Sequence, residues 1–205
     1  MKTLSDILFI ISNGLLIPVI ILLLYLAVRA IWILFSFYNE YKQKMKIASV
    51  FRKMIQNYSP EELEQTRITL ESYGKDGVTS CFQNLLSHKD DKIYCEHLLA
   101  DFQVDVQKQL SKYRILIKFG PMLGLMGTLI PMGPALVGLA SGDIVSMAYN
   151  MQVAFATTVV GMAVAAIGLA TLQMNKRFYA RSFNDLDFVF QKLQRNETES
   201  DIDRR

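Results

Sequence analysis

The sequence predicts an all-α integral membrane protein in which three transmembrane helices extend into a cytoplasmic helical bundle. Three segments contain no Asp, Glu, Lys or Arg: residues 7–28, 119–142 and 144–175. Each has the ~20 apolar residues that a helix needs to cross the hydrocarbon layer. The hydrophobic fraction of 51% is high, and no segment alternates in the manner of a strand. A soluble enzyme, a disordered chain and a secreted disulfide scaffold are excluded, so we expect no catalytic residues.

The basic residues predict how the chain is oriented in its membrane. Of the 22 Lys and Arg residues, one precedes the first span, twelve lie in residues 39–114 and seven follow the third span. The connection Ser141–Asp143 has none. Because basic residues near span ends favour the cytoplasm, the N-terminus is expected outside and both residues 39–114 and the tail inside. Eleven acids balance the twelve bases of that loop, so no nucleic-acid partner is expected.

The first span is expected to be uncleaved and to continue as one helix into the cytoplasm. Its apolar character runs past Arg29 to Phe37, which is longer than the ~7–15 apolar residues of a secretory signal. The chain then divides into four segments. These are a transmembrane helix at 1–38, a cytoplasmic helical segment at 39–114, transmembrane helices two and three at 115–175, and a cytoplasmic C-terminal helix and tail at 176–205.

Short helices are expected in the loop between spans one and two. Ser59 followed by Pro60 and two glutamates is a strong helix start, and this helix should end near Gly74. A second helix is expected at 76–87, followed by a turn at 89–91.

Two apolar stripes with helical spacing predict the packing of the cytoplasmic bundle. The first leads into span two and meets its first break signal at Gly120-Pro121: Tyr94, Leu98, Phe102, Val106, Leu110, Tyr113 and Ile117. The second follows span three with heptad spacing: Tyr179, Phe183, Leu186, Phe190 and Leu193. We expect the two stripes to pack on one another.

Metal binding is not expected, although the loop contains Cys81, His88, Cys95 and His97. Their spacing matches no compact ligand pair, and thiols in the cytoplasm stay reduced. The sequence therefore predicts no metal site, and no cofactor.

Spans two and three carry small residues where span one carries Ile and Leu. Gly120 and Gly124 form a GxxxG match, which lets helix backbones approach closely. The residues expected at helix contacts are Gly120, Gly124, Gly127, Ala154, Gly161, Ala165 and Gly168. The face of span three is expected to comprise Ala154, Thr158, Gly161, Ala165 and Gly168.

Three threonines are candidate linings of an ion path: Thr128, Thr157 and Thr158. A threonine hydroxyl both donates and accepts a hydrogen bond, so hydroxyls could line a narrow wet path without the cost of a buried charge. The alternative is that each hydroxyl bonds back to a carbonyl of its own helix, and the sequence does not separate the two. No Asp, Glu or His lies within the three uncharged segments, so a proton path would need a carboxylate from a partner.

Two strings resemble a known family. Residues 124–132 (GLMGTLIPM) resemble the second-span motif of the MotA/TolQ/ExbB proton channel family, and residues 154–161 (AFATTVVG) resemble its third-span motif. The resemblance covers about residues 115–180, and the expected topology agrees with it. One departure is Val153, which stands where ExbB-like members place a glutamate.

The resemblance implies a channel-forming subunit of an inner-membrane motor, driven by protons or Na⁺. It implies a homopentamer around two copies of a single-span ExbD/TolR/MotB-like partner, whose aspartate carries the ion past Thr128 and Thr158. The alternatives are a non-conducting oligomeric membrane scaffold or a helper subunit of a transporter.

Overall fold

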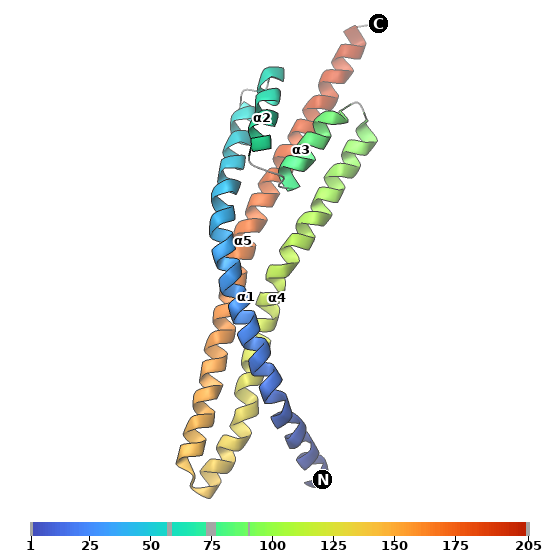
Figure 1. The fold of residues 1–205 in the computed structure, drawn as a ribbon. Helices are drawn as coiled ribbons and strands as arrows, with labels where there is room; N and C mark the ends of the chain where they lie inside the picture. Colours follow the sequence, from blue (N-terminus) through green and yellow to red (C-terminus); the bar gives the residue numbers. More distant parts are fainter. Residues whose placement is uncertain (1, 57–58, 73–76, 90, 204–205) are drawn as a thin grey trace. The chain divides into compact units, whose positions relative to one another are not determined.

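In a computed structural model the described residues are 2–56, 59–72, 77–89 and 91–203, and they form five helices and no strand (Figure 1). The helices are α1 (Lys2–Gln56), α2 (Pro60–Ser72), α3 (Gly77–Ser87), α4 (Lys92–Ser141) and α5 (Ile144–Asp203). The helices α1, α4 and α5 are long and apolar enough to cross a membrane. The expected all-α fold class is therefore confirmed.

The chain forms two compact units, which we describe separately. The span unit comprises Met1–Ser36 and Lys112–Leu172, and the bundle unit comprises Phe37–Ser111 and Gln173–Arg205. Because α1, α4 and α5 continue across these limits, each of them contributes one part to each unit. The helices α2 and α3 belong wholly to the bundle unit.

Helix α2 of the bundle unit begins where the sequence predicts. The Leu63 amide donates to the Ser59 carbonyl over 3.1 Å, which closes the first turn of α2. The predicted end of this helix near Gly74 lies outside the described residues, as does the predicted first residue of α3. A turn follows α3, and in it the Asp91 amide donates to the His88 carbonyl over 3.0 Å.

A tight turn joins α4 to α5, and Figure 1 shows the two helices leaving it side by side. Gly142 has a φ of 75°, a left-handed conformation that glycine adopts without a steric penalty. The Asp143 amide donates to the Gly138 carbonyl over 2.8 Å and the Gly142 amide to the Leu139 carbonyl over 3.2 Å. This pair of bonds is a Schellman motif. The Asp143 carboxylate then caps α5 by accepting from the Ser146 amide over 3.0 Å.

Helix α4 continues through the break signal at Gly120-Pro121. It contains Pro121, Pro131 and Pro134, each of which lacks the amide that would bond to the carbonyl four residues earlier. Transmembrane helices tolerate such prolines when neighbouring helices and side chains satisfy the freed groups. The expected break at Gly120-Pro121 is therefore a position inside a helix, and Gly120 lies against Gly161 of α5.

The core of the bundle unit consists of large side chains. Phe51 of α1 and Phe82 of α3 meet edge to face with ring centroids 5.2 Å apart, and both are almost fully buried. Other buried members are Ile47, Met54, Leu70, Val78, Leu85, Leu99, Phe102, Leu110, Leu186, Val189 and Phe190. The unit therefore has the apolar core of a water-soluble domain.

The stripe expected on α4 is displaced at its N-terminal end. Phe102, Leu110 and Tyr113 are buried as predicted, but Cys95 and Leu99 are buried in place of the preceding apolar residues, Tyr94 and Leu98. In the second stripe Tyr179, Leu186 and Phe190 are buried, and Phe183 and Leu193 are half-buried.

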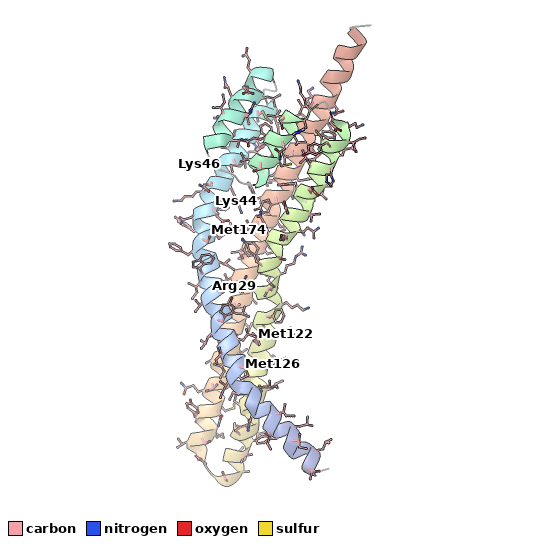
Figure 2. The ribbon with its side chains drawn as sticks, turned by 45° about the vertical axis from the view of Figure 1, so that its right-hand side comes forward. Arg29, Lys44, Lys46, Met122, Met126 and Met174 are labelled. Atoms are coloured by element: carbon pink, nitrogen blue, oxygen red, sulfur yellow. The ribbon has the colours of Figure 1, made fainter. Side chains whose placement is uncertain are left out.

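A polar contact ties three helices of the bundle unit together. Lys44 of α1, which Figure 2 labels, is 8% exposed. Its ammonium donates to the Asn175 Oδ1 of α5 over 2.6 Å. The same ammonium lies 4.9 Å from the centroid of the Tyr179 ring. The Tyr179 hydroxyl in turn donates to the Gln109 Oε1 of α4 over 2.5 Å. These contacts place Lys44, Tyr179 and Gln109 within side-chain reach of one another.

Candidate ion pathway and helix-packing site

The backbones of α4 and α5 touch in the span unit. A Cβ built on Gly161 would lie 2.5 Å from the Gly120 carbonyl oxygen and 3.0 Å from the Gly124 Cα. A Cβ built on Gly120 would lie 2.7 Å from the Gly161 carbonyl oxygen. Real Cβ atoms do not approach backbone so closely, so the crossing of these helices requires glycine on both sides.

Further small residues extend this contact toward both ends. A Cβ on Gly127 would lie 2.6 Å from both the Cβ and the Oγ1 of Thr157, so the threonine side chain fills the space beside this glycine. A Cβ on Gly168 would lie 2.9 Å from the Leu116 Cβ. Along this contact, Gly120 and Gly124 of α4 face Gly161 of α5, and Gly127 of α4 faces Thr157 of α5. At the other end, Gly168 of α5 faces Leu116 of α4.

The face that α5 buries differs at alternate positions from the face expected from the sequence. The buried residues follow a 3-4-3-4 spacing: Ala154, Thr157, Gly161, Val164 and Gly168. Thr158 and Ala165 are half-buried and lie at the edge of the contact. Their backbones still touch α4, because the Thr158 Cα and the Ala165 nitrogen lie 3.5 and 3.2 Å from Cβ atoms built on Gly124 and Gly120.

The three threonine hydroxyls donate to carbonyls of their own helices. Thr128 donates to Leu125 over 2.7 Å, and Thr157 and Thr158 both donate to Ala154, over 2.9 and 3.2 Å. Each hydroxyl oxygen keeps lone pairs that can accept a further hydrogen bond. Thr157 is 7% exposed and points into the α4–α5 contact, whereas Thr128 and Thr158 are half-buried. Within one chain, Thr128 and Thr158 are therefore the more accessible acceptors.

The cysteines and histidines of the loop lie in the bundle unit. Burial, with the neighbouring Cys95, raises the pKa of the Cys81 thiol to about 12, so this thiol stays protonated. In the part of the chain that the structure describes, no three His, Cys, Asp or Glu side chains lie together in a way that could hold a metal ion.

The sequence analysis missed the buried polar contact of Lys44 and Asn175. In the sequence Lys44 is one of the twelve basic residues of 39–114, yet it lies on the same helical face as Ile47 and Phe51, at spacings of three and four. Asn175 lies four residues before Tyr179, the first residue of the second apolar stripe. Extending that stripe by one turn reaches Asn175, and the spacing to Ile47 and Phe51 is the signal for Lys44.

The fold and the contact between α4 and α5 define a helical membrane protein whose second and third long helices pack through glycine, alanine and threonine. The model of the MotA/TolQ/ExbB proton channel family matches residues 42–187. The chain belongs to this family, as its two span motifs suggested. A comparison of the sequence with curated proteins gives no match.

Proposed function

We propose that the chain is the channel-forming subunit of an inner-membrane motor that is driven by protons or Na⁺. Membership of a proton channel family supports this proposal, and so does the α4–α5 contact. The observation that carries it is the pairing of accessible hydroxyls, on Thr128 and Thr158, with spans that contain no carboxylate. Such a path is complete only when another chain supplies the titratable group.

The missing carboxylate would come from a single-span ExbD/TolR/MotB-like partner. Because the threonine protons are already donated to helix carbonyls, the hydroxyl oxygens would act first as acceptors. A protonated aspartate on the partner could donate to these oxygens, and an ionised aspartate would require the threonines to rotate. This difference would couple the protonation of the partner to the contact between the two proteins.

The subunits would form a homopentamer around two partner copies, with α4 and α5 inside and the first span facing lipid. The exposed apolar residues of α1 support this arrangement. Within the most apolar stretch of each long helix, 11% of α1 is buried in one chain, against 33% of α4 and 28% of α5. The N-terminus would lie outside, and the bundle unit would lie in the cytoplasm.

One observation favours a second candidate function, a non-conducting oligomeric scaffold. All three hydroxyls make the bonds to their own helices that a purely structural role requires. The scaffold and the channel predict opposite results in the following experiment.

The experiment compares proton flow into vesicles that contain the chain alone or the chain with its partner. The chain alone should leak little, since no ionisable group lies deep in its spans. With the partner, flow should appear and should disappear when the partner's membrane aspartate is replaced by Asn. Robust flow through the chain alone, or no flow in the complex, would contradict the proposal.

A further inference from the structure

A groove runs between α1 and α5 on the surface of the bundle unit. Its volume is about 990 Å³. On the α1 side it extends from Met45 to Gln56, which is ~17 Å of helix at 1.5 Å per residue. Its floor is partly apolar, with Ala48, Ile55 and Ala180.

The rim of this groove is mainly basic. Arg52 and Lys53 from α1 and Arg181 from α5 line it, and all three are exposed. The one acid is Asp185, which is half-buried. Burial raises the pKa of its carboxyl, while Arg52 and Arg181 oppose that shift. The groove therefore suits an elongated, partly apolar occupant that carries negative charge.

The exposed face of α4 in the same unit has the opposite character. Residues 93–107 contain three acids, Glu96, Asp101 and Asp105, and no Lys or Arg. All three are exposed, and Val104 lies between the two aspartates with 65% of its surface exposed. Asp101 and Asp105 lie four residues apart on one face, which we call the acidic face of α4, whereas Glu96 lies on the other side of the helix. The Asp101 carboxylate also lies 3.4 Å from the His97 Nε2 of its own helix.

The charges of the two surfaces also lie at matching heights. Lys44 of α1 and Gln109 of α4 both contact Tyr179 of α5, so the three residues lie within side-chain reach of a shared level. Arg52 lies eight residues from Lys44 along α1, and Asp101 lies eight residues from Gln109 along α4. Each distance is ~12 Å of helix.

The second basic position gives a similar match. Arg181 lies two residues beyond Tyr179 and Asp105 lies four residues from Gln109, which correspond to ~3 and ~6 Å from the shared level. Side chains as long as arginine bridge a difference of this size. Copies related by a rotation axis that runs along the bundle meet at equal heights, so both pairs are compatible with a ring.

We propose that the groove between α1 and α5 of one copy receives the acidic face of α4 from the next copy. Arg52 then pairs with Asp101 of the neighbouring copy, and Arg181 pairs with Asp105 of the neighbouring copy. The contact is head to tail, and in the proposed oligomer the rotation between neighbouring copies closes it into a ring. This inference rests on the oligomer of the proposed function and adds the surfaces and their order.

Disulfide trapping tests this contact with the variant Ser49→Cys/Val104→Cys. Ser49 lines the groove five residues from Lys44, and Val104 lies five residues from Gln109, so both sit ~8 Å from the shared level. The native cysteines are buried and the Cys81 thiol has its pKa raised to about 12, so they stay unreactive. On oxidation the double variant should give a ladder of covalent multimers on a denaturing gel.

Each single variant should remain monomeric on the same gel, because a head-to-tail contact never brings two copies of one residue together. The control pair Ile68→Cys/Val104→Cys places the first thiol on an exposed part of α2 and should give no ladder. Cross-linking by either single variant would overturn the head-to-tail order. A cross-link from Cys at position 49 to the single-span partner would assign the groove to that partner and overturn the inference.

Native mass measurement of the same samples separates the two proposals. Oligomers without a ladder in the double variant would overturn this contact and leave the channel proposal standing. A monomeric wild-type chain would overturn the proposed assembly and this contact together.

Charge reversal provides a second measurement that does not depend on thiol geometry. Arg52→Glu/Arg181→Glu should weaken the oligomer about tenfold at low salt, since like charges then face each other. Asp101→Arg/Asp105→Arg should do the same, and the chain with all four changes should recover. Arg67→Glu on α2 is the control and should have no effect. Failure of the four-fold variant to recover, with its helical content intact, would contradict the pairing.

Discussion

The contacts inside the span unit are of the opposite kind to the contacts inside the bundle unit. In the span unit, α4 and α5 approach until the position of a Gly161 Cβ lies 2.5 Å from the backbone of the other helix. In the bundle unit, the centre is filled by rings and long side chains, with Phe51 and Phe82 at most 1% exposed. One contact depends on the absence of side chains and the other on their size.

The difference follows from the two solvents. In water, burial of large apolar side chains drives packing, so Phe and Leu contribute most. In lipid, the surroundings are as apolar as leucine, and close approach of backbones supplies the attraction. The same three helices therefore change their contact residues along their length. Substitutions that enlarge or reduce a side chain should consequently have opposite consequences in the two units.

The largest effect on stability is expected for Phe82→Ala in the bundle unit. This change removes a fully buried ring that packs edge to face on Phe51 and leaves a cavity. The free energy of unfolding should fall by about 3–5 kcal/mol. Chemical denaturation in detergent, followed by circular dichroism, measures the loss. Ile93→Ala, at a site 81% exposed, is the control and should change stability little. Equal effects of the two changes would show that the bundle unit lacks a packed core.

A smaller but definite loss is expected when one methyl group is added to the span unit. Gly161→Ala would force apart the backbones of α4 and α5 and should cost about 1–3 kcal/mol. The control is Gly14→Ala in α1, where a Cβ meets no atom within 4 Å. Because alanine favours a helix more than glycine does, this control should be neutral or slightly stabilising. The midpoint of thermal denaturation in detergent distinguishes the two, and a neutral Gly161→Ala would refute the backbone contact.

Most of the fold follows from periodicity, charge and turn chemistry. The uncharged segments, the Ser59-Pro60 start and the apolar spacing predict helices that the structure contains. Where two apolar residues are adjacent at the end of a stripe, the sequence does not show which of the two is buried. Tyr94 stands beside Cys95, and Leu98 beside Leu99, so the helical period permits either member of each pair. The fold buries Leu99 and also Cys95, which lies close to Cys81 of α3, and such tertiary contacts are not encoded in the local spacing.

The candidate site follows from the sequence to a similar degree. The small residues on both helices and the three threonines are visible in the motif, but their assignment to the centre or the edge of a contact is not. Thr157 and Thr158 are adjacent, and a rotation of α5 by a fraction of a turn exchanges their environments. Hydroxyl orientation also depends on backbone geometry, because each threonine can choose between its own helix and a neighbour.

The smallest change in stability, and a large change in function, is expected for Thr128→Val/Thr158→Val. Valine preserves the shape of each side chain and removes the hydroxyl. Hydrogen bonds in membrane helices average about 0.6 kcal/mol, so oligomer yield should be nearly unchanged. Both residues are half-buried and retain accessible acceptor lone pairs. If a partner aspartate exchanges its ion through these oxygens, the path loses acceptors where the spans offer no ionisable substitute.

Proton uptake by vesicles carrying the complex is the decisive measurement, with oligomer yield recorded on the same preparations. Uptake should fall several-fold in the double variant, and each single variant should lie between it and the unmodified chain. Thr69→Val is the matched control, because its hydroxyl donates to the Gln65 carbonyl over 2.7 Å in a helix outside the span unit. Unchanged uptake in the double variant would assign both hydroxyls to their own helices. The small-residue contact would then serve assembly alone, as the scaffold alternative requires.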